Sequence, residues 1–201
     1  RPKQLNALNK MTIEELHNIL SHFINDSKIR TIIITGSGEK AFVAGADIKE
    51  FADFDVEKGK NLAKSGQEKL FNFVEQYPKP IIAAINGFAL GGGLELAMAC
   101  HFRLCSENAK MGLPEVSLGV IPGYGGTQRL AQLIGKGKAM ELIMTAKMMS
   151  ATEALNYKLV NAILMCILLK IVPNKINHSF IFRMVQQVRE NSSSDAEFKQ
   201  N

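Results

Sequence analysis

The stretch Gly87–Glu95, with the sequence Gly-Phe-Ala-Leu-Gly-Gly-Gly-Leu-Glu, decides the fold prediction for this chain. It follows the apolar run Pro80–Asn86, which is typical of a buried strand, and runs into Leu94–Ala99, whose composition favours the start of a helix. Three glycines at such a junction let the backbone approach a ligand closely and leave N–H groups free to bind it. The positive end of the helix dipole adds to this attraction, so the junction predicts a site for an anionic oxygen.

A carboxylate stands beside these backbone donors. Glu95 falls within the first turn of the expected helix. Fixed N–H groups stabilise negative charge as it develops on a carbonyl oxygen, and a neighbouring carboxylate can transfer protons. The combination indicates an oxyanion site with an acid/base group, which is a feature of enzymes.

Strand-like and helical segments alternate along the rest of the chain. A capping box at Thr12–Glu15 predicts a helix running to Ile24, and a second one stands at Ser150–Glu153. Buried or short strands are expected at Thr31–Thr35, Ile81–Ile85, Phe102–Cys105 and Met111–Gly112, and further helices at Val56–Gln76, Thr127–Ile134, Lys138–Thr145 and Thr152–Asn156. This alternation predicts an α/β fold with helices packed over short strands.

One glycine motif formally matches a dinucleotide-binding fingerprint. Gly36–Ala41 follows a predicted strand and fits the G-x-G-x-x-G/A pattern. A true fingerprint opens a long amphipathic helix, whereas this motif runs into the small, glycine-interrupted stretch Phe42–Asp47. The sequence therefore argues against nucleotide binding here. The loop Ala44–Ile48 is either an ordinary tight turn or, paired with the glycine triplet, a source of a second oxyanion donor.

A second carboxylate lies in another glycine-rich region. Glu115 follows Pro114, and five glycine or proline residues crowd the connection Gly119–Gly126. Glu115 is either a surface loop residue or the partner of Glu95 in one pocket. Two carboxyl groups packed together in a low dielectric titrate as a pair and can retain one proton for transfer.

Composition limits the class of protein. The chain has 201 residues, 46% hydrophobic and 21% charged, which suits one well-buried core. Its formal net charge of +5 is spread along the chain, so most basic side chains are expected on the surface, with a phosphorylated ligand or weak nucleic-acid contact as options. The longest apolar run, Ala162–Leu169, is far below the roughly 20 residues that a membrane-spanning helix needs.

Cysteine and histidine patterns exclude several chemistries. The three cysteines, Cys100, Cys105 and Cys166, form no C-x-x-C pair, which argues against a disulfide framework or zinc site and favours a reducing compartment. The four histidines lack metal-ligand spacing, and no G-x-S-x-G motif is present. The methionines at helical spacing, Met140, Met144 and Met148, are expected in the core.

Taken together, these motifs resemble the enoyl-CoA hydratase/isomerase (crotonase) family. The resemblance is carried in family order by Arg1–Leu8, Ala41–Ile48, Asn86–Glu95 and Gly112–Leu130. It implies a spiral of ββα units over residues 1–160, and a C-terminal helical region over 161–201 that helps to build trimers or hexamers. It also implies an acyl-CoA thioester as ligand, with no metal or redox cofactor. The chain starts at the Arg-Pro-Lys motif and departs from the family pattern after about Asn161.

The resemblance also implies roles for individual residues. The N–H groups at Ala46 and Gly92 would hold the thioester oxygen. Glu115 would donate a proton to the α-carbon, and Glu95 would activate the attacking water. The family pattern also places Gly123 near that water.

Contacts with the CoA part of the ligand are implied for a second set of residues. Lys3 and Lys49 are candidates for the CoA phosphates. Ala44, Asp47 and Ile48 match the loop on the CoA side.

The activity implied is reversible syn hydration of a trans-2-enoyl-CoA to a 3-hydroxyacyl-CoA, in a bacterial cytoplasm or, alternatively, a mitochondrial matrix. Two alternatives stay open: an isomerase that moves the double bond, and a non-catalytic relative that binds acyl-CoA or RNA. Membrane and nucleic-acid partners are not expected. Binding alone would need neither Glu95 nor Glu115, so their presence favours an enzyme.

Overall fold

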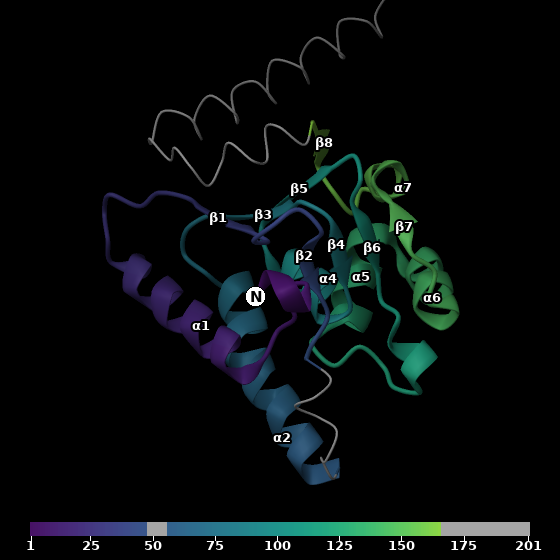
Figure 1. Ribbon diagram of the computed structural model, residues 1–201, viewed down its shortest axis with the longest axis horizontal. Helices are drawn as coiled ribbons and strands as arrows, with labels where there is room; N and C mark the ends of the chain where they lie inside the picture. The colour runs from purple at the N-terminus through teal and green to yellow at the C-terminus, as the bar shows by residue number, and fades with distance from the viewer. Residues whose placement is uncertain (48–55, 166–201) are drawn as a thin grey trace, which may run out of the picture. The chain divides into compact units, whose positions relative to one another are not determined.

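The computed structural model in Figure 1 describes residues 1–47 and 56–165. The predicted contact residues Ile48 and Lys49 lie outside the described residues, as does nearly all of the predicted C-terminal region 161–201, so these remain predictions. The helices are α1 (Lys10–Ile24), α2 (Val56–Gly66), α3 (Asn72–Glu75), α4 (Gly92–Ala99), α5 (Gly126–Ile134), α6 (Lys136–Thr145) and α7 (Ala151–Asn156), with 3₁₀ turns η1 (Pro2–Gln4) and η4 (Glu115–Leu118) and a π turn η3 (Gln67–Phe71). The strands are β1 (Ile32–Thr35), β2 (Ala41–Ala44), β3 (Ile81–Ile85), β4 (Phe88–Leu90), β5 (Phe102–Ser106), β6 (Lys110–Gly112), β7 (Met149–Ser150) and β8 (Ala162–Leu164).

The chain winds as a spiral between two sheets. The first sheet has the order β1-β3-β5-β8 and is parallel throughout, and the second has the order β2-β4-β6-β7 with only β7 antiparallel. Successive strand pairs β1/β2, β3/β4 and β5/β6 therefore give one strand to each sheet, and helices follow each pair. This arrangement confirms the predicted spiral of ββα units. Figure 1 shows α4 in the middle, with α1 and α2 on one side and α6 and α7 on the other.

Strand burial follows position in the first sheet. All five residues of β3 are buried because β3 lies between β1 and β5. A parallel strand covered on both faces reads as a continuous apolar run, which is what the sequence shows. The predicted buried strand at Thr31–Thr35 is present as β1, but it is half-buried rather than buried, since it forms an edge of the sheet.

A glycine sets how closely α4 packs on the second sheet. A Cβ placed on Gly93 would lie 1.9 Å from the backbone oxygen of Val43 in β2. No side chain fits at that distance, so only glycine lets the helix lie directly on the strand. This contact brings the first turn of α4 beside the loop that follows β2.

Two details of the predicted helices and strands are corrected. The first helix begins at Lys10 rather than at the Thr12 box, because the side chain of Asn9 caps it by accepting the Thr12 N–H at 2.9 Å. The second capping box, between Ser150 and Glu153, is confirmed. The strand β4 was not expected, since three residues flanked by glycines carry too short a pattern to detect.

Other expectations are settled by exposure and topology. Met140, Met144 and Met148 are 49%, 70% and 48% exposed, so the prediction that they lie in the core is wrong. Met140 and Met144 share one face of α6, which lies at the surface in the described part of the chain, and Met148 follows the end of that helix. The turn after Gly36 leads into strand β2 rather than into a helix, so Gly36–Ala41 is not a dinucleotide-binding motif. No helix within residues 1–47 and 56–165 has both the length and the apolar character required to cross a bilayer.

Candidate active site

Three segments distant in sequence meet at the N-terminus of α4. They are the loop after β2, the Gly91–Gly92 turn, and the connection from η4 to α5. The close packing of α4 on β2 brings the loop after β2 beside the Gly91–Gly92 turn. Hydrogen bonds to Glu95 hold the connection from η4 to α5 against α4. The predicted donors and both predicted carboxylates lie on these segments.

The backbone N–H groups of Ala46 and Gly92 lie near each other. Ala46 forms a parallel bridge with Leu8, in which the Leu8 N–H donates to Gly45 at 2.9 Å and the Asp47 N–H donates to Leu8 at 2.8 Å. The residues flanking Ala46 make these bonds, so the N–H of Ala46 itself points the opposite way. A Cβ on Gly92 would lie 3.8 Å from that nitrogen.

The Gly92 N–H is free of helical bonds. The first bond of α4 runs from the Glu95 N–H to the Gly91 oxygen at 2.9 Å, and Gly92 is the first helical residue. Its N–H therefore has no partner within the helix. The N–H groups of Ala46 and Gly92 thus come from different segments and lie near each other, and the helix dipole reinforces that of Gly92.

Glycine at position 91 makes room for Glu115. Gly91 has φ 50° and ψ −124°, a conformation that side chains rarely adopt. A Cβ there would lie 2.8 Å from Oε1 of Glu115. The absence of a side chain thus lets the Glu115 carboxyl group lie against the turn that precedes Gly92.

Glu115 carries an uncommitted carboxyl oxygen. Its Oε2 atom is buried and has no hydrogen-bond partner among residues 1–47 and 56–165. Burial raises the pKa of this carboxyl group, and a bond from its own backbone N–H partly offsets the effect. A buried oxygen with no protein partner can bond to a small molecule.

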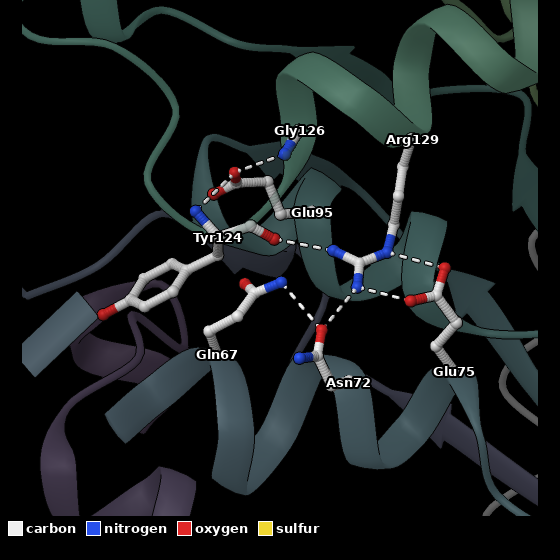
Figure 2. A network of polar contacts seen from close by, with 7 residues as sticks. All are labelled: Gln67, Asn72, Glu75, Glu95, Tyr124, Gly126 and Arg129. Carbon is white, nitrogen blue, oxygen red and sulfur yellow. Dashed lines mark hydrogen bonds and ion pairs between the residues drawn. The ribbon is translucent and has the colours of Figure 1, made fainter. Parts of the chain in front are cut away.

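Glu95 is held much more firmly. Only 1% of the residue is exposed, and Oε1 accepts hydrogen bonds from the N–H groups of Tyr124 and Gly126, both at 2.8 Å, as Figure 2 shows. Burial, with a smaller contribution from the charge of Glu115, raises the pKa of Glu95 to about 7, although these two bonds and the charge of Arg129 lower it. A group with a pKa near neutrality can exchange protons under ordinary conditions.

The two carboxyl groups form an interacting pair. Glu95 is buried, Glu115 is half-buried with its Oε2 atom buried, and the charge of Glu115 contributes to the raised pKa of Glu95. Such a pair resists double ionisation, so it can hold one proton while keeping one charge. The structure therefore brings the predicted carboxylates together, and Glu115 is not a surface loop residue.

The other predicted contact residues lie around this centre. Gly123 is exposed, and a Cβ on it would meet no atom within 4 Å. The Ala44 N–H donates to the Leu5 oxygen at 3.0 Å, and Asp47 pairs with Arg1 at 2.6 Å. The loop after β2 is thereby fixed to the N-terminal segment.

Lys3 lies on a separate hollow of about 450 Å³. Its lining comes from the N-terminal segment and from the turn between β1 and β2: Pro2, Lys3, Leu5, Asn6, Ser37, Gly38, Glu39, Lys40 and Ala41. Sequence reasoning missed Lys40, because only the fold shows that a second lysine lines this hollow with Lys3.

Sequence reasoning also gave no role to Tyr124 or Arg129. The Tyr124 ring stacks on Phe71 with centroids 4.4 Å apart, and its backbone contacts both Glu95 and Arg129. Arg129 is 5% exposed and pairs with Glu75. The sequence signal that could have identified Arg129 is a basic residue on an otherwise apolar face of a predicted helix.

Glu95→Gln is expected to stabilise the chain at pH 8 and to lose this advantage towards pH 5. Between the ordinary pKa of 4.5 and the raised value of about 7, the folded chain holds a proton that the unfolded chain has released. Wild-type stability therefore falls as the pH rises through this window. The difference at pH 8 is expected to reach about 3 kcal/mol, at about 1.36 kcal/mol per pKa unit.

Urea unfolding at the two pH values measures this difference. Glu68→Gln, on an exposed position, controls for the loss of one negative charge. An equal difference between Glu95→Gln and wild type at pH 5 and pH 8 would show that Glu95 does not titrate in this window.

Comparison with known proteins identifies the family. Residues 1–166 match the family model described as enoyl-CoA hydratase/isomerase, so the chain belongs to this family. It is 50% identical over 163 residues to a short-chain-enoyl-CoA hydratase of Clostridium acetobutylicum, which covers 81% of this chain and 62% of that protein. It is 49% identical over 163 residues to a crotonyl-CoA hydratase of Syntrophomonas wolfei, with the same two coverages.

Solved structures agree with this assignment. An enoyl-CoA hydratase from Bacillus anthracis superposes with a TM-score of 0.80 at 43% identity, covering 94% of this chain and 70% of that one. One from Geobacillus kaustophilus superposes with a TM-score of 0.81 at 39% identity, covering 94% of this chain and 68% of that one. The chain spans about 60% of the length of the two curated relatives above.

Proposed function

We propose that this chain catalyses the reversible syn addition of water to a trans-2-enoyl-CoA, giving a 3-hydroxyacyl-CoA. The observation that carries the proposal is the pair of carboxyl groups, the buried Glu95 and the half-buried Glu115 with its buried Oε2 atom, beside the backbone N–H groups of Ala46 and Gly92. Relatives about 50% identical are named hydratases of short-chain enoyl-CoA and crotonyl-CoA, which supports the same reaction here.

The two backbone donors fit the electronic demand of this reaction. Attack of water on the β-carbon of a conjugated thioester pushes electrons onto the thioester oxygen. N–H groups of Ala46 and Gly92 aimed at that oxygen stabilise the enolate-like transition state more than the ground state. They need no reorganisation, because β2 and α4 fix both of them.

The carboxyl pair supplies the proton transfers. Glu95 takes a proton from the attacking water while the oxygen–carbon bond forms at the β-carbon. The π electrons of the double bond then take the proton of Glu115 at the α-carbon, and passage of a proton from Glu95 to Glu115 restores the pair. Two backbone N–H bonds orient Glu95 and favour its ionised form, which suits the base. The free Oε2 of Glu115 suits the donor, and Gly123 leaves open space beside Tyr124.

The rest of the ligand extends from this centre. Lys3 and Lys40 line one hollow and offer two positive charges to CoA phosphates, with Lys49 as a further candidate. We also propose contacts with the CoA part of the ligand for Ala44 at the end of β2, for Asp47 in the loop that follows it, and for Ile48, which lies outside the described residues. The proposed reaction uses no metal or redox cofactor, since protons and backbone donors account for every step.

Assembly and location are proposed on the same basis. We propose a homotrimer or a hexamer made of two trimers, which sedimentation of the purified chain would measure. A bacterial cytoplasm is the favoured location because relatives such as the Clostridium acetobutylicum hydratase are bacterial, with a mitochondrial matrix as the alternative, since a relative in Dictyostelium discoideum is named mitochondrial.

Turnover of crotonyl-CoA in D₂O tests the function. The proposal predicts loss of the conjugated enoyl absorbance and a 3-hydroxybutyryl-CoA product with one deuterium on the α-carbon. Activity only on a 3-enoyl-CoA, by migration of the double bond, would favour the isomerase alternative. Salt-sensitive RNA binding without any turnover would favour the non-catalytic alternative.

A further inference from the structure

Arg129 reaches from α5 back to the loop that holds Glu95. The residue is 5% exposed, and Nη1 donates to the Tyr124 oxygen at 2.7 Å. Nε and Nη2 donate to the two carboxylate oxygens of Glu75 at 3.1 and 2.7 Å, and Nη2 also contacts Asn72 at 3.3 Å. The guanidinium group therefore connects this loop to α3, as Figure 2 shows.

The carbonyl group that Arg129 holds stands between the two N–H groups that hold Glu95. Along the chain, the Tyr124 N–H bonds to Glu95, the Tyr124 oxygen bonds to Arg129, and the Gly126 N–H again bonds to Glu95. Fixing the central carbonyl limits rotation of the peptide units on both sides. The aim of both donors thus depends on the guanidinium group.

Packing around the loop is equally tight. Gly125 has φ +87°, and a Cβ there would lie 2.4 Å from Nη1 of Arg129. On the other side, the ring of Tyr124 stacks on Phe71 of η3 at an interplanar angle of 10°. The loop is therefore clamped through its backbone and through its one aromatic side chain.

We propose that Arg129 is a positioning residue for Glu95, holding the Tyr124–Gly126 loop so that its two N–H groups keep the carboxylate aimed at the reacting water. The proposal rests on the proposed hydration reaction for its effect on turnover. Its structural part, the control of Glu95 by Arg129, can be measured without turnover.

The charges around Glu95 allow the positioning role of Arg129 to be distinguished from a direct electrostatic effect of its charge on Glu95. Glu115 on η4 and Arg129 on α5 act on Glu95 through their charges. Glu75 on α3 pairs bidentately with Arg129 and offsets its charge. Loss of the orientation of Glu95 and a change in the charge near it are therefore expected to change the pKa of Glu95 differently in different variants.

Arg129→Lys keeps the positive charge but removes the planar guanidinium group with its several N–H donors. One ammonium group cannot bond to both oxygens of Glu75 and to the Tyr124 oxygen in the same geometry. We expect kcat on crotonyl-CoA to fall about 10- to 100-fold with KM within about 3-fold, because small misplacements of acid/base groups cost about that much. Arg103→Lys is the matched control, since Arg103 is also buried (6% exposed) and also bonds backbone oxygens, those of Leu159, Cys100 and Ala97 rather than those of the Tyr124–Gly126 loop.

Titration of the Glu95 carboxyl carbon by ¹³C NMR is the readout that does not need turnover. We expect its pKa to rise by about one unit in Arg129→Lys, because the two N–H bonds weaken. Glu75→Gln distinguishes the two effects by the direction in which the pKa of Glu95 changes. Removal of a negative charge alone would lower this pKa, whereas release of Arg129 would raise it. Glu75 has a side chain 45% exposed, so this variant is expected to fold.

The outcomes separate the two proposals. A raised pKa of Glu95 in Arg129→Lys and Glu75→Gln, but not in Arg103→Lys, supports the positioning role even if wild type hydrates no crotonyl-CoA, a result that would overturn only the proposed function. An unchanged or lowered pKa in Glu75→Gln overturns the positioning role. If wild type hydrates crotonyl-CoA, a loss of kcat in Arg129→Lys no greater than that in Arg103→Lys overturns it as well.

Discussion

Replacement of Glu115 by glutamine is expected to lower kcat for crotonyl-CoA hydration by about 10²-fold or more, the usual scale for an acid/base group. The amide has the shape of the carboxyl group, so it still fits against Gly91, where a Cβ would lie 2.8 Å from Oε1. It cannot supply the proton that the α-carbon needs. KM is expected to change little, because binding of the thioester oxygen depends on Ala46 and Gly92. Steady-state absorbance assays give both constants.

Glu107→Gln serves as the control for this experiment, because Glu107 is exposed and lies outside the site. It is expected to keep wild-type turnover. If Glu115→Gln kept more than about a third of the wild-type kcat, a loss far smaller than acid/base groups show, Glu115 would not be the proton donor.

Gly93→Ala is expected to destabilise the chain strongly. Its new Cβ would lie 1.9 Å from the backbone oxygen of Val43, and neither atom can rotate aside, because the backbone fixes the positions of both. Relief requires α4 to move off β2, so the loss is expected to reach about 3 kcal/mol or more, the upper end for overpacked sites. Urea unfolding measures it, and a chain that does not fold fits the same expectation.

Gly59→Ala is the matched control, because Gly59 lies in α2 and a Cβ there would meet no atom within 4 Å. It is expected to stabilise the chain by about 0.5–1 kcal/mol through helix propensity. Wild-type stability in Gly93→Ala would contradict the close packing of α4 on β2.

Local patterns predicted much of the fold. The apolar run at β3 and the Ser150 capping box each identified an element, since burial on both faces and a reciprocal cap leave clear signals. The burial of the edge strand β1 and of the methionines in and after α6 was predicted wrongly, because burial depends on neighbours that no local pattern shows.

The candidate site was predictable in part for a similar reason. Glu95 and Glu115 each stand in a glycine-rich turn, a pattern that drew attention before any fold was known. Their meeting depends on the packing of α4 on β2, which periodicity does not reveal. Arg129 acts through the Tyr124 carbonyl, and no spacing rule encodes a contact of a side chain with the backbone of a preceding loop.

The structure of the chain bound to butyryl-CoA, a saturated thioester that cannot be hydrated, would test the proposed roles of these residues most directly. We expect the thioester oxygen at about 3 Å from the nitrogens of both Ala46 and Gly92, the distance at which oxyanion donors act. We also expect the β-carbon on the side of Glu95 and Glu115. A thioester oxygen directed away from both nitrogens, or an acyl chain remote from the two carboxyl groups, would contradict these roles.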